Sequence, residues 1–117
     1  MIERKVLLVD DVMLTRENLR NILENNGFKI LGEAENGFEA IKKYQQLKPD
    51  LVTLDIEMPG LDGLETLKML KMLDEDCKVI IISELENKRA EALICGAKAF
   101  IEEPFRPQTL INILQRV

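Results

Sequence analysis

Short apolar segments alternate with segments of helical periodicity along the whole chain, and this alternation constrains the fold more than any other feature. The apolar segments span residues 5–10, 28–34, 51–55, 78–83 and 98–102. The short continuous apolar run within residues 5–10 is typical of a parallel strand that is covered on both faces, and the other four segments read as further strands. The other segments predict helices over 12–25, from 35 or 36 to the residue before Pro49, over 64–74, a short one interrupted near Gly96, and one after Pro107.

Each predicted helix for which a face can be traced carries its apolar residues together. These residues are Leu19, Ile22 and Leu23 in the first helix, Phe38, Ile41, Tyr44 and Leu47 in the second, Ala90, Leu93, Ile94 and Ala97 in the fourth, and Leu110, Ile113, Leu114 and Val117 in the fifth. Such a face packs against a sheet. Five strand and helix units with short connections predict an α/β fold with a doubly wound parallel sheet. The segment 78–83 is the most apolar strand and is expected to be central.

The composition fits one compact domain over residues 1–117 and excludes several kinds of site. The chain has no histidine, and its two cysteines, Cys77 and Cys95, lack Cys-x-x-Cys spacing. A catalytic Cys/His pair, a Ser/His/Asp triad and most zinc sites are therefore excluded. The cysteines are expected to be reduced, partly buried thiols, with a redox role as the alternative.

The charge and the apolar pattern bear on partners and location. A net charge of −5 disfavours nonspecific binding to nucleic acid or to anionic membranes. No apolar stretch approaches membrane-spanning length, and the N-terminus lacks the apolar region of a signal peptide. We therefore expect a cytoplasmic protein that does not itself bind nucleic acid or membrane.

Polar side chains, most of them acidic, follow the predicted strands. Asp10 and Asp11 follow the first strand, Asp55 ends the third, Ser83 ends the fourth, and the fifth runs into Glu103. Ligands of doubly wound sheets bind outside the carboxyl ends of the strands. Converging carboxylates suit Mg²⁺ or Mn²⁺, and a carboxylate beside such a metal can attack a phosphoryl group. The alternative is that these aspartates only cap helices or form turns.

Longer motifs at the same positions resemble one known family. They are Val-Leu-Leu-Val-Asp-Asp at 6–11, Pro-Asp-Leu-Val-Thr-Leu-Asp-Ile-Glu-Met-Pro-Gly-Leu-Asp-Gly at 49–63, Ile-Ile-Ile-Ser at 80–83, Gly-Ala-Lys-Ala-Phe-Ile at 96–101 and Pro-Phe at 104–105. Together they resemble the receiver domains of two-component response regulators over essentially all 117 residues. The resemblance implies a flavodoxin-like sheet of five parallel strands in the order 2-1-3-4-5 with five flanking helices, the order known for chemotaxis receivers.

The resemblance also implies a role for each residue at the carboxyl edge. Asp55 is expected to accept the phosphoryl group. Asp11, Asp55 and the main-chain carbonyl of Glu57 are expected to ligate Mg²⁺ or Mn²⁺, with Asp10 acting through a bound water. Ser83 is expected to donate a hydrogen bond to the phosphoryl group and to move toward it.

Signalling partners follow from the same resemblance. A histidine kinase or phosphotransfer protein would supply the phosphoryl group, and a downstream effector protein or output domain would recognise the fourth helix, fifth strand and fifth helix. Phe100 occupies the position of the switch aromatic, which packs inward in the active domain, and simple packing is the alternative. The chain would be a phosphoacceptor rather than an enzyme, with at most self-phosphorylation from small donors and autodephosphorylation.

Two residues depart from the family pattern. Glu103 stands where a lysine usually contacts the phosphoryl oxygen, and Glu84 follows Ser83 where a small residue is usual. One hypothesis is slower Mg²⁺-dependent phosphorylation, and the other is an atypical receiver that binds partners independently of phosphorylation. Under the first hypothesis, three cations are candidates to replace part of the missing charge: Lys88, Arg89 and Lys98.

Rival functional classes find less support in the sequence. A metal-dependent phosphatase could use Asp55 as its nucleophile, but Glu57 stands where the haloacid-dehalogenase family has a second aspartate. A flavin-binding module would need a loop rich in Ser, Thr and Gly after the first strand, and residues 10–15 do not form one.

Overall fold

The computed structural model describes residues 3–117, and it contains each of the predicted strands and helices. The strands are β1 (Lys5–Val9), β2 (Lys29–Ala34), β3 (Leu51–Leu54), β4 (Val79–Ser83) and β5 (Ala99–Glu102). The helices are α1 (Met13–Glu24), α2 (Gly37–Leu47), α3 (Gly63–Leu73), α4 (Arg89–Ile94) and α5 (Pro107–Arg116), with a 3-10 helix, η1 (Glu86–Lys88), directly before α4. None of the described helices has the length and apolar character needed to cross a membrane.

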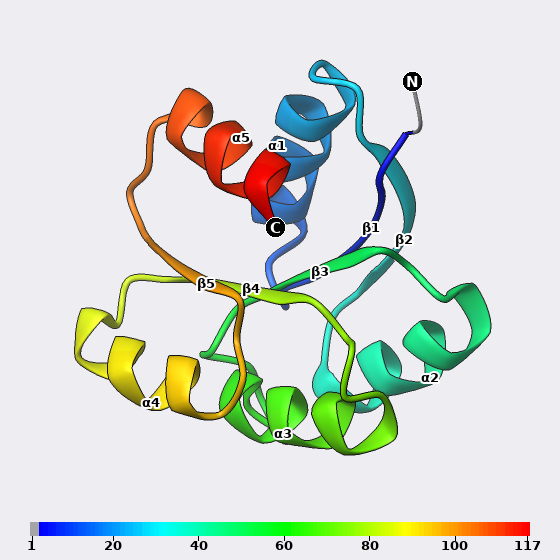
Figure 1. Ribbon diagram of the computed structural model, residues 1–117, viewed down its shortest axis with the longest axis vertical. Coiled ribbons are helices and arrows are strands. Elements are labelled where there is room, and N and C mark those ends of the chain that lie inside the picture. Colours follow the sequence, from blue (N-terminus) through cyan, green and yellow to red (C-terminus); the bar gives the residue numbers. More distant parts are fainter. Residues whose placement is uncertain (1–2) are drawn as a thin grey trace.

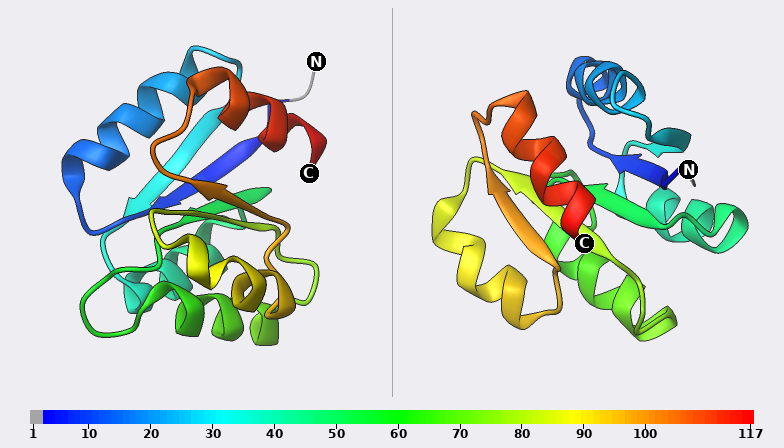
Figure 2. Two further views of the ribbon diagram at one scale, coloured as in Figure 1. Left: turned by 90° about the vertical axis from the view of Figure 1, so that its left-hand side faces the viewer. Right: turned by 45° about the horizontal axis from the view of Figure 1, so that its top comes forward.

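The five strands form one parallel sheet in the order β2-β1-β3-β4-β5. Helices α1 and α5 cover one face, and α2, α3 and α4 cover the other (Figure 1). The turned views show the same two helical layers on either side of the sheet (Figure 2). The predicted doubly wound, flavodoxin-like sheet is confirmed. Strand β4 is interior, as its apolar sequence predicts, although the middle position belongs to β3.

Two apolar layers hold the sheet between its helices. In β1, Val6 and Leu8 pack in the layer with α1 and α5, whereas Leu7 and Val9 pack in the layer with α2, α3 and α4. All four side chains are buried. Because both faces of the sheet are covered, the inner strands β1, β3 and β4 read as nearly continuous apolar runs rather than as alternating ones.

The predicted apolar face of α2 is wrong at its ends. Ala40 and Tyr44 are buried there, whereas Phe38 is 66% exposed and Leu47 is 37% exposed. Residues spaced three apart move by about 60° around an α-helix at each step, so Phe38 and Leu47 lie on opposite sides. The face of α2 that contacts the core is instead marked by Ala40 and Tyr44, which are spaced i, i+4.

The predicted face of α4 is also wrong. Ala92 is fully buried, while Leu93 is 43% and Ile94 is 85% exposed. The helix has only six residues and ends before Ala97, so the expected i, i+7 pattern is never completed. The side of α4 that packs in the core is therefore the one that carries the small Ala92.

Thr53 in β3 gives a first prediction, because its hydroxyl is buried and has no hydrogen-bond partner within residues 3–117. Its neighbours on the adjacent strands are Leu8 and Ile80, both apolar. We expect Thr53→Val to raise the free energy of unfolding by about 1 kcal/mol, since the substitution removes an unpaired polar group at nearly constant volume. Urea denaturation measures this change.

Thr66→Val is the matched control for that substitution. Thr66 is equally buried, but its hydroxyl donates to the Asp62 carbonyl over 2.7 Å. This variant is expected to lose about 1 kcal/mol, because it removes a buried hydrogen bond, although the Thr66 amide still donates to the same carbonyl over 2.9 Å. Destabilisation by Thr53→Val of the same size as by Thr66→Val would mean that Thr53 has a partner after all.

Candidate functional site

A cavity of about 300 Å³ opens at the carboxyl edge of the sheet, at the point where the strand order reverses around β1 and β3. Six of the eight residues that line it carry carboxylates: Asp10, Asp11, Asp55, Glu57, Glu84 and Glu103. Val12 and Thr15 complete the lining. We call this the acidic cavity. No lysine or arginine is among these eight lining residues.

Main-chain hydrogen bonds fix the strand ends that carry the aspartates. The amide of Asp10 donates to the Ala34 carbonyl of β2 over 3.0 Å, and the amide of Asp55 donates to the Val9 carbonyl over 3.1 Å. The Asp10 carboxylate accepts from the Val12 amide at 2.9 Å, which shapes the turn into α1. The three strands β2, β1 and β3 therefore place these carboxylates together.

The three aspartates meet the geometric requirement for a divalent cation. One carboxylate oxygen each from Asp10, Asp11 and Asp55 can be chosen so that all three lie within 4.8 Å of one another. Two oxygens bound directly to Mg²⁺ at its usual distance lie at most about 4.2 Å apart, so small adjustments or one intervening water complete the fit. Oxygen ligands suit Mg²⁺ and Mn²⁺.

Burial and mutual repulsion perturb the carboxyl groups of the acidic cavity. Burial, followed by the charges of Asp10 and Glu103, raises the pKa of Asp55 to about 7, although amide hydrogen bonds from Glu57 and Ile56 act against this. Burial first, and the neighbouring Asp11 charge, also raise the pKa of Asp10. The site thus resists full ionisation unless a cation is present.

The raised pKa of Asp55 predicts a pH dependence of metal binding. Below its pKa of about 7 the carboxyl holds a proton that Mg²⁺ must displace, so we expect binding to be about tenfold weaker at pH 6 than at pH 8. Calorimetric titration at both pH values measures it, and Asp55→Asn should remove most of the dependence.

The same shift affects stability without metal. The folded-state pKa of Asp55 lies above its ordinary value of 3.8, so its contribution to stability is complete below pH 3.8 and is lost as the pH rises through about 7. The metal-free protein should therefore gain stability from Asp55→Asn mainly above pH 7.

Glu103 and Glu84 add to the negative charge of the acidic cavity. Burial is the main cause that raises the pKa of Glu103, and the charges of Asp10 and Glu84 add to it. Glu103 is joined to the end of β4 because its amide donates to the Ser83 carbonyl over 2.9 Å. Both residues that depart from the family pattern thus line the acidic cavity.

None of the three cations proposed to replace the missing lysine lines the acidic cavity. Lys88 lies 3.9 Å from Glu91, and Arg89 pairs with Glu86 at 2.6 Å. Lys98 is exposed at the start of β5, at the opposite edge of the sheet. In the described structure the negative charge of the cavity is therefore not offset by these residues.

Ser83 and Phe100 are both buried, at 1% and 4% exposure. The Ser83 hydroxyl accepts a hydrogen bond from the Leu85 amide at 2.9 Å, and Ser83 is not among the eight residues that line the acidic cavity. The Phe100 ring packs in the core, and the Arg89 guanidinium lies 4.8 Å from its centroid. Arg89 also donates to the Phe100 carbonyl at 3.0 Å.

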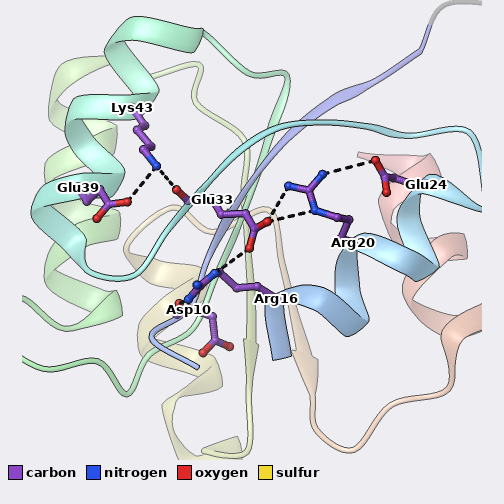
Figure 3. Close-up of polar contacts among 7 residues, drawn as sticks. All are labelled: Asp10, Arg16, Arg20, Glu24, Glu33, Glu39 and Lys43. Carbon is purple, nitrogen blue, oxygen red and sulfur yellow. Dashed lines mark hydrogen bonds and ion pairs between the residues drawn. The ribbon is translucent and has the colours of Figure 1, made fainter. Parts of the chain in front are cut away.

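One group near the site is absent from the sequence-based prediction. Arg16 of α1 donates to the main-chain carbonyl of Asp10 and pairs with Glu33 of β2 (Figure 3). The sequence contains one signal of this group, the i, i+4 spacing of Arg16 and Arg20 on the predicted first helix. Their shared partner on β2 becomes visible only when α1 lies against that strand.

Comparison with known proteins relates the chain to response regulator receiver domains by sequence and by structure. The sequence profile of the response regulator receiver domain matches residues 6–115. The chain is 43% identical to the chemotaxis protein CheY of Listeria monocytogenes over 96% of both sequences, and 40% identical to CheY of Thermotoga maritima over 97% of both. The CheX–CheY–BeF3–Mg²⁺ complex from Borrelia burgdorferi contains a similar chain, with a TM-score of 0.94 and 37% identity over 98% of this chain and 89% of the other.

Proposed function

Because this chain belongs to the response regulator receiver family, we propose that it accepts a phosphoryl group on Asp55 in a Mg²⁺-dependent reaction. Receiver domains of this chemotaxis type are signalling domains rather than classical enzymes. The observation that carries the proposal is the convergence of three carboxylate oxygens within 4.8 Å at the carboxyl edge of the sheet. The Borrelia neighbour, whose structure contains BeF3 and Mg²⁺, supports it.

The chemistry would use the following residues. Asp11, Asp55 and the Glu57 carbonyl would hold the cation, with Asp10 acting through a water. A bound divalent cation supplies positive charge for the phosphoryl oxygens. An oxygen of Asp55 would form the new bond to phosphorus, while the bond from phosphorus to the donor breaks and its electron pair leaves with the donor. The Ser83 hydroxyl already accepts from an amide, so its proton is free to donate to the phosphoryl group.

Partners and switching belong to the same proposal. A histidine kinase or phosphotransfer protein would be the donor, small phosphodonors would allow slow self-phosphorylation, and the chain would act in the cytoplasm. An effector protein or output domain would bind the α4–β5–α5 face. In the Borrelia complex the similar chain, CheY, is bound to another protein, CheX, and this supports the proposal that the present chain binds a partner protein. Phe100 is already buried, so packing and switching are both compatible with its position.

One observation favours the alternative of an atypical receiver. Six carboxylates line the acidic cavity without a lysine or arginine among its eight residues. Each uncompensated anion there opposes the approach of a negatively charged phosphoryl group. The alternative function is binding to a partner protein independently of phosphorylation.

The deciding experiment is incubation with acetyl phosphate and Mg²⁺, followed by intact-mass measurement over time. We expect a phosphoryl adduct in the parent, none after chelation of the metal, and none in Asp55→Asn. Asp76→Asn changes an exposed aspartate outside the acidic cavity and should leave the adduct unchanged. An adduct that forms only after Glu103→Lys would establish the atypical receiver instead.

A further inference from the structure

A network of charged side chains joins α1 to the edge strand β2 beside the acidic cavity (Figure 3). Glu33 of β2 accepts from Arg16 at 2.8 Å and from Arg20 at 2.6 Å. Arg20 also reaches Glu24 at 3.5 Å, and this contact lies on the exposed side of α1. One strand carboxylate thus holds two successive arginines of the same helix.

Arg16 differs from Arg20 in what else it contacts. Its guanidinium donates through a second nitrogen to the main-chain carbonyl of Asp10 at 2.5 Å. The main-chain amide of Asp10 donates to the Ala34 carbonyl of β2. Both main-chain polar groups of Asp10 are therefore tied to β2, one directly and one through Arg16 and Glu33.

The contacts of Arg16 are more sheltered than those of Arg20. The Arg16 side chain is 12% exposed, against 33% for Arg20 and 27% for Glu33. Burial by itself would raise the pKa of Glu33, but the hydrogen bonds from Arg20 and Arg16 outweigh it and lower the pKa. A charged hydrogen bond in a partly buried place holds its geometry better than a solvated one.

We propose that Arg16 is a positioning residue that fixes the Asp10–Asp11 turn for the divalent cation, with Glu33 holding Arg16 in place. The inference deepens the proposed function and rests on it for the identity of the cation. Arg16 does not line the acidic cavity. It acts through the main chain of Asp10, as outer partners do when they orient the groups that bind a metal.

The sign of the effect on Mg²⁺ binding separates positioning from simple charge. Arg16→Ala removes a positive charge beside the acidic cavity, and by charge alone this change would tighten Mg²⁺ binding. Loss of positioning would weaken binding. We expect Arg16→Ala to raise the Mg²⁺ dissociation constant about tenfold, measured by calorimetric titration.

Arg20→Ala is the matched control. It makes the same charge change on the same helix and removes a contact to the same glutamate, but it leaves the Asp10 carbonyl bonded. We expect its Mg²⁺ affinity to stay within about twofold of the parent, since Arg16 keeps its own bonds to Glu33 and to the Asp10 carbonyl. Arg16→Lys keeps the charge without the forked geometry and should recover affinity only in part.

Amide hydrogen exchange without metal gives a second readout that is independent of phosphorylation. The Asp10 amide, which donates to Ala34 of β2, and the Val12 amide, which donates to the Asp10 carboxylate in the turn, should exchange faster in Arg16→Ala and at the parent rate in Arg20→Ala. Urea denaturation confirms that each variant is folded. Equal or tighter Mg²⁺ binding by Arg16→Ala would overturn the inference. A parent without Mg²⁺ affinity would refute the proposed function, and unchanged exchange at Asp10 would separately refute positioning.

Discussion

Replacing Glu103 by lysine is expected to weaken Mg²⁺ binding by about tenfold and to speed phosphoryl transfer to Asp55 by at least about tenfold at saturating metal. Glu103 lines the acidic cavity, and its pKa is raised first by burial and then by the charges of Asp10 and Glu84, which repel its carboxylate. Mg²⁺ gains from this surplus of negative charge, whereas an incoming phosphoryl group is opposed by it.

The size of the effect follows from the Coulomb energy. At roughly 4 Å and an effective dielectric of about 20, one pair of unit charges contributes about 4 kcal/mol. Glu103 is only half-buried, so solvent screening reduces the effective value to on the order of 1.4 kcal/mol, which is about tenfold in a rate or an equilibrium constant.

Glu102→Lys provides the matched control. This substitution makes the same charge change one residue earlier in the chain, but Glu102 is exposed and does not line the acidic cavity. Its Mg²⁺ affinity and its acetyl phosphate reaction, followed by intact mass, should stay close to those of the parent. If Glu103→Lys binds Mg²⁺ as tightly as the parent, the repulsion argument is wrong.

The second large effect is expected at Gly63, the first residue of α3. A Cβ atom added there would lie 2.0 Å from the Asp55 carbonyl oxygen and 2.6 Å from the Ile56 Cα. Both are main-chain atoms, so no side chain can move aside. The Gly63 amide donates to the Ile56 carbonyl over 2.8 Å, and this bond holds the helix start against the end of β3.

We therefore expect Gly63→Ala to lower the free energy of unfolding by about 3 kcal/mol, and to reduce phosphoryl transfer because the Asp55 main chain is displaced. Urea denaturation and intact-mass kinetics measure the two effects. Gly27→Ala is the control, since Gly27 has a positive φ of 86° but open space around its Cβ position. Its cost should be about 1 kcal/mol, from backbone conformation alone.

The part of the site that lies on strand ends could be predicted from the sequence. Asp10, Asp11 and Asp55 each follow an apolar run, and parallel strands bring their carboxyl ends to one edge. The position of Lys98 could have been anticipated in the same way. It precedes β5 whereas Glu103 follows it, so the two residues lie at opposite edges of the sheet.

Features that depend on tertiary packing were beyond the sequence. The Arg16–Glu33 pair forms because α1 packs beside β2, and no local pattern connects residues 17 positions apart. The burial of Ala92 rather than Leu93 depends on which side of the six-residue helix α4 faces the core. In both cases the preference of the local segment is weak, and contact with the rest of the fold decides.

The two outer strands of the sheet share a further property. Lys43 of α2 donates to the main-chain carbonyl of Glu33 in β2, and Arg89 of α4 donates to the main-chain carbonyl of Phe100 in β5. Unpaired carbonyls on an edge strand invite pairing with a strand from another molecule, and charged side chains discourage it. A cation from a neighbouring helix thus occupies one carbonyl on each outer strand, and this contact disfavours edge-to-edge pairing of the sheet with a strand of another molecule.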